Sequence, residues 1–373
     1  MNSDGARRYR APGRVNIIGE HTDYSGGRVL PTTTEIYTQL MATARDDRRI
    51  SVRSVNLDDT QTFDLDDLAV SPDPGWIDYA KGVAALLEQR GIKLSGADIE
   101  IDSAIPIGGG LSSSAALEVA IATALLDMAA SELPPADIAD LCRRAENEYA
   151  GVNCGIMDQF AIACCQRGKA IMIDCHNMES KHVRLPADIR LLVTDTGVKH
   201  ALADGSFNQR TNEVATATEI LAEHIDGMAS LRDVETADLD RYRHELGDTL
   251  FRRCRHVVSE NRRVLDACAA LESGDLIRLG ALINGSHASL RDDFEVSCDE
   301  LDALADVAND SEGVFGSRMI GAGFGGCVLS VVEVDRIEKV TEHIRHAHES
   351  MTGKSPWMHV VSETDPAGKL TQQ

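Results

Sequence analysis

The chain has 373 residues, of which 43% are hydrophobic, and it carries a formal net charge of −23 at pH 7. This length predicts two domains, and the mixed composition is typical of an ordinary globular protein. The charge argues against nucleic acid as a partner, because a phosphate-binding surface needs an excess of lysine and arginine, and it also argues against attraction to an anionic membrane.

The first part of the chain contains both strand and helix signals. Alternating or β-rich patterns predict strands over residues 36–45, 49–56 and 98–104. We expect the first two of these strands to pair around Asp46 and Asp47. Apolar spacing and proline at a helix start predict helices over residues 76–89, 112–130 and 134–149.

The second part begins and ends with strands. Apolar runs predict strands over residues 169–174, 191–196, 313–321 and 327–333. Helical periodicity dominates residues 208–311 and returns over 335–350. Because strands and helices do not alternate regularly, we predict an α+β protein with two domains rather than a doubly wound parallel sheet. We place residues 1–185 in the N-terminal domain and residues 186–373 in the C-terminal domain.

Two further patterns concern the cellular environment. Nine cysteines are scattered without any Cys-x-x-Cys pair, so we expect reduced core residues rather than a metal site or disulfides. No stretch approaches the roughly 18 apolar residues that a membrane span needs, and the N-terminus is polar. The prediction is a cytoplasmic protein that does not enter membranes.

Residues 11–31 form the most informative segment of the chain. They place Arg14, Glu20, His21 and Asp23 close together between glycines. Two carboxylates and an imidazole supply the hydrogen-bond donors and acceptors that a hydroxyl-rich ligand needs. A solvated, charged turn is the alternative interpretation of these residue types when they are taken alone.

Residues 106–116, PIGGGLSSSAA, join a predicted strand to a predicted helix. Glycines let the backbone approach an anion, and a helix start offers unpaired N–H groups. Ser112, Ser113 and Ser114 can cap the helix or reach a phosphate or magnesium ion. The alternative is a plain capped turn. The loop lacks the Gly-Lys-Ser/Thr of a Walker loop and the Gly-x-Gly-x-x-Gly spacing of nicotinamide-binding folds.

Two later segments carry weaker signals. Asp158 stands in an apolar run at an expected helix start, where an acid could also cap the helix or pair with a neighbour. Residues 321–328 are rich in glycine and lie between two predicted strands, which by itself indicates a tight turn or a bulge.

Four stretches of this sequence resemble galactokinases, which belong to the GHMP family of small-molecule kinases. Residues 13–24, GRVNIIGEHTDY, resemble the galactokinase signature, and residues 106–115 resemble the second GHMP motif. Residues 154–159, CGIMDQ, match the galactokinase catalytic segment, and residues 321–328 match the third GHMP motif. The motifs occur in family order, so the resemblance covers nearly the whole chain.

The resemblance implies a two-domain GHMP kinase fold with the active site in the cleft between the domains. It implies an ATP-dependent sugar 1-kinase that uses Mg²⁺ and transfers the γ-phosphate of ATP to the anomeric hydroxyl of galactose. The alternatives are an N-acetylgalactosamine kinase, a broad-range hexose 1-kinase and a non-catalytic sensor of galactose and ATP. Mevalonate and homoserine kinases fit less well, because residues 20–23 are of the sugar type. A monomer and a dimer both remain open.

The resemblance also assigns roles to individual residues. Asp158 would orient or deprotonate the anomeric hydroxyl, while Arg14 would favour the ionised carboxylate or stabilise charge on the transferred phosphoryl group. The implied sugar-binding residues are Glu20, His21, Asp23, Gly155, Asp158 and Phe207. The implied ATP-binding residues are Trp76, Tyr79, Gly108, Gly109, Gly110, Leu111, Ser112, Ser113, Ser114 and Ala115. Ser113 and Glu146 would hold the magnesium ion.

Two of these assignments have a specific alternative or departure. Trp76 and Tyr79 could be ordinary core residues of their helix rather than walls of the adenine site. Phe207 stands where galactokinases usually carry a tyrosine, whose hydroxyl faces the axial 4-hydroxyl of galactose. One hydrogen-bond partner of the sugar is therefore expected to be missing in this chain; the alternative is that a neighbouring group, for instance Ser206 or Asn208, replaces it.

Overall fold

The computed structural model describes residues 5–106, 109–199, 203–362 and 364–370. It divides into two compact units, each made of separate stretches of chain. Unit 1 comprises Met1–Arg14, Thr33–Arg167 and Glu363–Gln373, and unit 2 comprises Val15–Thr32 and Gly168–Ser362. The single domain boundary after residue 185 stays a prediction, since these compact units change over at other positions. Among the described helices, none has the length and apolar character needed to cross a membrane.

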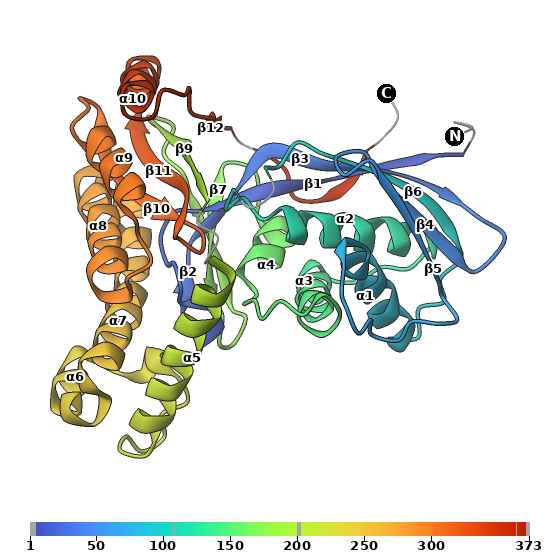
Figure 1. Cartoon of the computed structure of the whole chain (residues 1–373), viewed down its shortest axis with the longest axis horizontal. Coiled ribbons are helices and arrows are strands. Elements are labelled where there is room, and N and C mark those ends of the chain that lie inside the picture. Colours follow the sequence, from blue (N-terminus) through green and yellow to red (C-terminus); the bar gives the residue numbers. More distant parts are fainter. Residues whose placement is uncertain (1–4, 107–108, 200–202, 363, 371–373) are drawn as a thin grey trace. The chain divides into compact units, whose positions relative to one another are not determined.

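Unit 1 is built on a six-stranded sheet (Figure 1). Its strands, in spatial order, are β13 (Gly368–Leu370), β1 (Arg7–Asn16), β3 (Pro31–Ala44), β6 (Ala97–Ser103), β4 (Arg49–Ser54) and β5 (Asp59–Asp64). β6 runs antiparallel to β3 and parallel to β4. The predicted strand over residues 98–104 is therefore a central strand of this sheet.

The expected pairing of residues 36–45 with residues 49–56 is wrong, because β6 lies between β3 and β4. Residues 45–48 contain no glycine for a tight hairpin turn. Instead, Arg45 N donates to Gly96 O at 2.9 Å and Gly96 N donates to Asp47 O at 2.8 Å. These bonds place the start of β6 beside the end of β3, and β4 pairs with β5 on its other edge.

The helices of unit 1 lie on one face of this sheet (Figure 1). They are α1 (Trp76–Gln89), α2 (Ser113–Met128), α3 (Pro135–Ala145), η2 (Glu146–Ala150) and α4 (Met157–Cys164). The predicted bounds of the first helix are confirmed. The helix that was expected to continue to Tyr149 stops being regular at Ala145 and ends in the π-helical turn η2.

Unit 2 contains two further sheets. The strands of the four-stranded antiparallel sheet are, in order, β10 (Val314–Ile320), β11 (Gly325–Glu333), β9 (Ile189–Lys199) and β12 (Met358–Val361). The strands of the three-stranded sheet are β2 (Arg28–Val29), β7 (Lys169–Asp174) and β8 (Ser180–Arg184). Helices α8 and α9 pack against β10, and α10 packs against β9.

The long helical region predicted over residues 208–311 is confirmed. The helices of unit 2 are η1 (Asp23–Ser25), α5 (Ala203–Ala222), η3 (Leu231–Asp233), α6 (Thr236–Arg241), α7 (Arg243–Ser273), α8 (Leu276–Ser289), η4 (Leu290–Phe294), α9 (Asp299–Asn309), η5 (Val334–Arg336) and α10 (Ile337–Thr352). Gly247 interrupts α7 with a φ of 66°. None of the nine cysteines forms a disulfide in this structure, and five of them are buried; that their thiols are reduced stays a prediction.

Candidate functional site

The predicted catalytic pair is in direct contact within unit 1. Arg14 Nε donates to Asp158 Oδ1 at 2.7 Å, and Arg14 Nη2 lies 2.7 Å from the same oxygen. Arg14 is 5% exposed. The side chain of Asp158 is 28% exposed, so its carboxylate remains open to a ligand. This pairing joins residues that lie 144 positions apart in the sequence.

Strand β1 places Arg14 against the glycine-rich loop. Arg14 N donates to Leu111 O at 3.2 Å, and Arg14 Nη1 donates to Gly110 O at 2.5 Å. The preceding residue, Gly13, allows this close approach, since a Cβ atom there would lie 3.0 Å from Leu111 O, a tight contact. The same arginine therefore connects the loop with the carboxylate of Asp158.

Ser112 completes the hydrogen bonding of this carboxylate. Its Oγ donates to Asp158 Oδ2 at 2.6 Å. Ser112 is also the residue before α2 and has a left-handed backbone with a φ of 63°. Non-glycine residues adopt this conformation rarely, and strained backbone of this kind is often found at functional sites. Arg14 thus holds one oxygen of Asp158 and Ser112 holds the other.

A cavity of about 190 Å³ opens beside the start of α2. Trp76 and Tyr79 from α1 and Ser113 and Ser114 from α2 line it, together with residues of β3, β4 and β6. Both aromatic side chains are only partly buried, which favours a binding wall over a core position. Trp76 is held by its indole N–H, which donates to Asp59 Oδ2 at 2.9 Å.

The glycine-rich loop offers its backbone rather than its side chains. Leu111 and Ala115 are fully buried and can reach a ligand only through backbone groups. Gly109 and Gly110 are described, with Gly110 at a φ of 73°. Gly108 lies outside the described residues. The N–H groups of the first turn of α2 have no partner within the helix, which suits an anion.

Glu146 lies next to the same helix start. Its carboxylate is hydrogen-bonded by Ser114 and accepts a 2.6 Å bond from Gln159 Nε2. Burial raises the pKa of Glu146, the Ser114 bond opposes this shift, and the charge of Asp158 raises the pKa further. A cation near both carboxylates would relieve their mutual repulsion.

The donor set at this position fits a magnesium ion. Mg²⁺ prefers oxygen ligands and usually keeps several waters, so one carboxylate and one hydroxyl suffice from the protein. Glu146 would supply the carboxylate, and Ser113 would supply a hydroxyl on the wall of the cavity. Within the described residues, no cluster of three or more His, Cys, Asp or Glu side chains offers a dedicated metal site.

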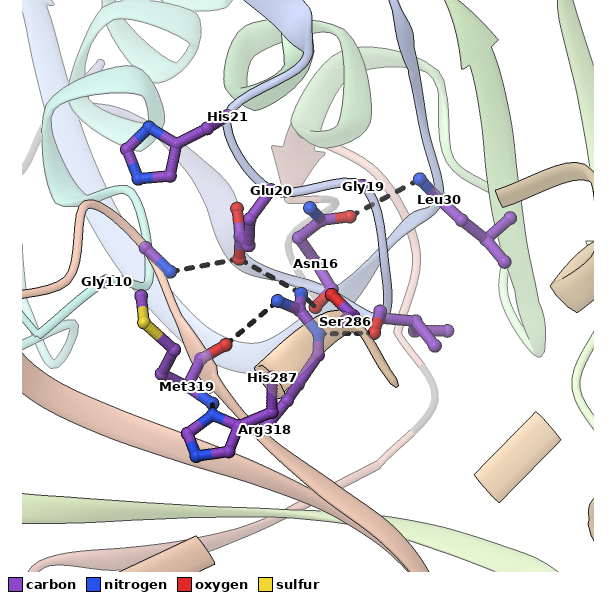
Figure 2. Close-up of polar contacts among 12 residues, drawn as sticks. Asn16, Gly19, Glu20, His21, Leu30, Gly110, Ser286, His287, Arg318 and Met319 are labelled. Carbon is purple, nitrogen blue, oxygen red and sulfur yellow. Dashed lines mark hydrogen bonds and ion pairs between the residues drawn. The ribbon is translucent and has the colours of Figure 1, made fainter. Parts of the chain in front are cut away.

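In unit 2, the signature segment surrounds a buried arginine. Arg318 Nη2 lies 3.1 Å from Glu20 Oε1 and donates to Asn16 O at 2.6 Å, while Arg318 Nε donates to Ile17 O at 2.8 Å (Figure 2). Glu20 Oε1 also accepts a 3.0 Å bond from Gly321 N, the first residue of the glycine-rich stretch 321–328. Glu20, a predicted sugar ligand, is thus held in place by one of its oxygens.

His21 has partners at both ring nitrogens. Nε2 donates to Ala322 O at 3.1 Å, so Nδ1 accepts from the hydroxyl of Tyr24 at 3.0 Å. Burial lowers the pKa of His21 to about 3, so the ring is neutral. Its ring centroid lies 5.8 Å from that of Phe207 and 4.8 Å from that of Phe294. The predicted sugar residues His21 and Phe207 are therefore neighbours.

Two side chains of helix α7 form hydrogen bonds with the backbone of the signature segment. Glu260 Oε1 accepts from Gly19 N at 2.9 Å, and His256 Nε2 donates to Glu20 O at 3.0 Å. Gly19 has a φ of 105°, and a Cβ atom there would lie 2.7 Å from Arg28 O. Glycine is therefore required at this turn.

The two remaining predicted sugar residues lie in different units. Asp23 begins the short helix η1 of unit 2 and is partly buried. Gly155 precedes α4 in unit 1, next to the predicted catalytic segment.

Sequence reasoning missed several residues that build these sites. Arg318, Glu260, His256, Glu118 and Gln159 are all buried. For Arg318, Glu118 and Gln159 the available signal was a charged or amide side chain among apolar neighbours, because such groups are buried only with partners. His256 and Glu260 stand in a polar stretch of sequence and gave no such signal. Their partners lie far away in the sequence, so the signal does not say which groups pair.

Three family models match the chain. They are the galactokinase galactose-binding signature over residues 2–44, the GHMP kinases N terminal domain over residues 78–166 and the GHMP kinases C terminal over residues 267–349. The matched regions contain the signature, the glycine-rich loop and the segment around Asp158. The N terminal GHMP model matches before the C terminal one along the chain.

Individual relatives agree with the family models. The chain is 41% identical to the galactokinase of Roseiflexus sp. (strain RS-1), covering 97% of this chain and 92% of that protein. It is 42% identical to the galactokinase of Streptomyces coelicolor, covering 93% and 90% respectively.

Solved structures show the same relationship. The structure matches that of Lactococcus lactis galactokinase complexed with galactose with a TM-score of 0.93 at 36% identity, covering 98% of this chain and 95% of that chain. The mevalonate kinase of Methanococcus jannaschii, at 18% identity and a TM-score of 0.68 over 96% of this chain and 98% of that one, shares the fold. The chain belongs to the galactokinase family of GHMP kinases.

Proposed function

We propose that this chain is an ATP-dependent galactose 1-kinase in which Asp158 and Arg14 carry the phosphoryl transfer. The observation that supports these roles is the contact of Arg14 with both Asp158 and the glycine-rich loop, at 2.7 Å and 2.5 Å. Because the Arg14 guanidinium contacts both the Asp158 carboxylate and the glycine-rich loop, it lies where it can influence both the acceptor hydroxyl and the transferred phosphate. Membership of the galactokinase family supports the reaction itself.

Asp158 orients the anomeric hydroxyl of the sugar. Arg14 occupies Oδ1 and Ser112 occupies Oδ2, and each carboxylate oxygen can accept a further hydrogen bond. The fixed carboxylate therefore accepts the hydroxyl hydrogen and points an oxygen lone pair of the sugar at the phosphorus atom. Phosphoryl transfer depends mainly on this kind of positioning and on electrostatic stabilisation.

Arg14 supplies fixed positive charge. Its guanidinium is almost completely buried and is held by Asp158 Oδ1 and Gly110 O, so little reorganisation is needed when charge develops on the phosphoryl group. In a chain with a net charge of −23, such local positive charge is what attracts the nucleotide.

The nucleotide binds in unit 1 at the cavity beside α2. The aromatic side chains of Trp76 and Tyr79 face the base, and the first turn of α2 receives the phosphates. Ser113 and Glu146 would hold Mg²⁺, which would supply positive charge opposite the phosphate oxygens. The sugar contacts of unit 2 come from Glu20, His21, Asp23 and Phe207, with Glu20 and His21 already held in place by protein partners.

We also place this enzyme in the cytoplasm. Its nine cysteines are free of disulfides, and thiols persist in a reducing compartment that also supplies ATP. Fractionation of cells that express the protein at native level tests this location.

ADP release from MgATP, measured over a panel of sugars, tests the proposed activity. The panel contains galactose, glucose, N-acetylgalactosamine and mevalonate, and the product of the best substrate is analysed for the position of its phosphate. Galactose should give the highest kcat/KM and a 1-phosphate. A preference for N-acetylgalactosamine would support the alternative kinase, and sugar binding without ADP release would support a sensor.

A further inference from the structure

One amide group bridges two acidic side chains behind the start of α2. Gln159 Nε2 donates to Glu118 Oε2 at 3.1 Å and to Glu146 Oε2 at 2.6 Å. Glu118 lies in the middle of α2 and Gln159 in the first turn of α4. Both have no exposed surface, and Glu146 is 5% exposed. Glu118 has no place in the reaction described above, yet it is a carboxyl group in a fully apolar stretch of helix.

Two oxygens of this group are buried without a hydrogen bond, Glu118 Oε1 and Gln159 Oε1. If Glu118 is ionised, both atoms are acceptors, so neither can satisfy the other. A single proton on Glu118 Oε1 turns that atom into a donor. Because Glu118 Oε2 already accepts from the amide nitrogen of Gln159, a carboxylic acid and an amide can then form two parallel hydrogen bonds.

The surroundings of Glu118 favour its neutral form. Burial is the largest cause, and it raises the pKa of Glu118 well above its usual value. The Gln159 hydrogen bond acts in the opposite direction. The other titratable groups that face Glu118 are neutral at pH 7, namely Tyr79, Cys142 and Cys154.

We propose that Glu118 is a protonated positioning residue, which donates its carboxyl hydrogen to Gln159 Oε1 and thereby fixes the amide of Gln159 on Glu146. A free glutamine amide could turn and present its oxygen to Glu146, which would repel the carboxylate. The paired amide keeps its N–H on Glu146 Oε2 and leaves the rest of that carboxylate for the cation. This consequence rests on the proposed role of Glu146 as a magnesium ligand, whereas the proton on Glu118 does not.

Infrared spectroscopy tests the proton directly and without turnover. The wild-type protein at pH 7 should show the carbonyl band of a buried protonated carboxyl group, and Glu118→Gln should lack it. Glutamate-selective ¹³C labelling of the wild type shifts the band and keeps the test valid if the variant does not fold. The absence of a protonated-carboxyl band in the wild type would overturn the proposal.

Two substitutions at position 118 test the positioning role. Glu118→Gln replaces the O–H donor by an N–H donor of the same shape, so the Mg²⁺ concentration for half-maximal rate should stay at the wild-type value. Glu118→Leu removes both bonds to Gln159 and should raise that concentration about tenfold, as loss of a partner behind a metal ligand typically does. The KM for galactose should stay unchanged in both variants.

Glu146→Gln is the matched control. If Glu118→Gln raises the Mg²⁺ requirement as strongly as Glu146→Gln does, Glu118 acts as a charge and the proposal is wrong. If instead Glu146→Gln leaves the Mg²⁺ requirement unchanged, the proposed metal ligand is wrong, while the infrared band still decides the proton on Glu118.

Discussion

Arg318 and Glu20 form a buried ion pair, with Arg318 Nη2 3.1 Å from Glu20 Oε1 and side chains that are 0% and 4% exposed. Arg318 lies on β10, just before the glycine-rich stretch 321–328, and Glu20 lies in the signature segment. The same guanidinium also donates to the carbonyl oxygens of Asn16 and Ile17 (Figure 2). Arg318, together with Gly321 N of the third motif, which donates to Glu20 Oε1, therefore holds the first motif in shape.

Arg318→Met should destabilise the protein and weaken sugar binding. Removing one partner of a buried pair leaves Glu20 as an uncompensated charge, at a cost of about 3–5 kcal/mol. Urea unfolding measures the loss, and the KM for galactose should rise in the folded fraction. The control is Arg278→Met, which breaks the exposed pair with Asp266 and should cost about 0–1 kcal/mol. Equal stability of the two variants would show that the Arg318 cluster contributes no more than a surface pair.

Asp158→Asn and Arg14→Ala should each lower kcat with galactose by at least about a hundredfold, as the loss of a preorganised electrostatic partner does. Asn keeps the shape of Asp158 but cannot keep the charge that Arg14 faces at 2.7 Å. Steady-state kinetics and circular dichroism measure activity and folding in parallel. A folded Asp158→Asn variant with most of its turnover intact would mean that the assigned chemistry is wrong.

Ser113→Ala and Glu146→Gln should raise the magnesium requirement and lower turnover, with little change in the binding of galactose alone. Both side chains belong to unit 1, whereas Glu20, His21 and Asp23 belong to unit 2. The residues proposed to bind MgATP therefore differ from these proposed sugar ligands. Calorimetry with galactose, and rates over a range of Mg²⁺ concentrations, separate the effects. If both variants lost galactose binding equally, these residues would have a structural role.

Stability should fall as the pH drops below about 6.5, and His256 should account for part of the loss. Burial lowers the pKa of His256 from 6.5 to about 4, so the unfolded chain binds more protons between these values and stability rises with pH across that window. A shift of this size corresponds to about 3 kcal/mol. The pKa of His21, lowered to about 3, acts in the same direction.

Urea unfolding of His256→Gln between pH 4 and pH 7 checks this expectation. The variant removes the titrating group and should show a flatter stability profile than the wild type, even if its stability at pH 7 is lower. His343→Gln, on an exposed turn of α10, serves as control and should follow the wild-type profile. If the stability of His256→Gln depended on pH as steeply as that of the wild type, other groups would cause the loss of stability at low pH.

Periodicity and family motifs predicted most of the architecture. They failed where contacts between residues far apart in the sequence determine the structure, as in the pairing of strands. The helix at residues 76–89 was predictable because its apolar spacing and its start are local features. The pairing of β3 with β4 was mispredicted because neighbours in the sequence were taken as neighbours in the sheet. The short strands β12 and β13 have too few residues to show an alternating pattern.

The candidate site was also predicted only in part from the sequence. The resemblance to known motifs indicated Arg14 and Asp158 before any contact was known, and the structure joins them. Arg318 gave no such signal, because a single arginine in an apolar strand does not reveal a partner 298 positions away. Glu118 was hidden in the same way within an apolar helix. Only three-dimensional contacts show which buried polar groups belong together.

Phe207→Tyr should sharpen the preference for galactose. Phe207 lies on α5 with its ring 5.8 Å from the rings of both His21 and Tyr24, beside the proposed sugar contacts. Its ring can form a wall of the sugar site, but it cannot donate or accept the hydrogen bond that a tyrosine hydroxyl would offer to the 4-hydroxyl. Such a bond contributes roughly 0.5–1.5 kcal/mol, or about 2- to 13-fold in affinity.

The variant should therefore show a lower KM for galactose or a narrower range of accepted hexoses, measured as kcat/KM over galactose, glucose and 2-deoxygalactose. Ser206→Ala is the comparison, because Ser206 could replace the missing hydroxyl from the neighbouring position. If Ser206→Ala weakens galactose while Phe207→Tyr changes nothing, the serine already supplies the bond. If neither substitution changes KM or sugar range, Phe207 does not face the sugar, and the specificity of this chain depends on Glu20, His21 and Asp23 alone.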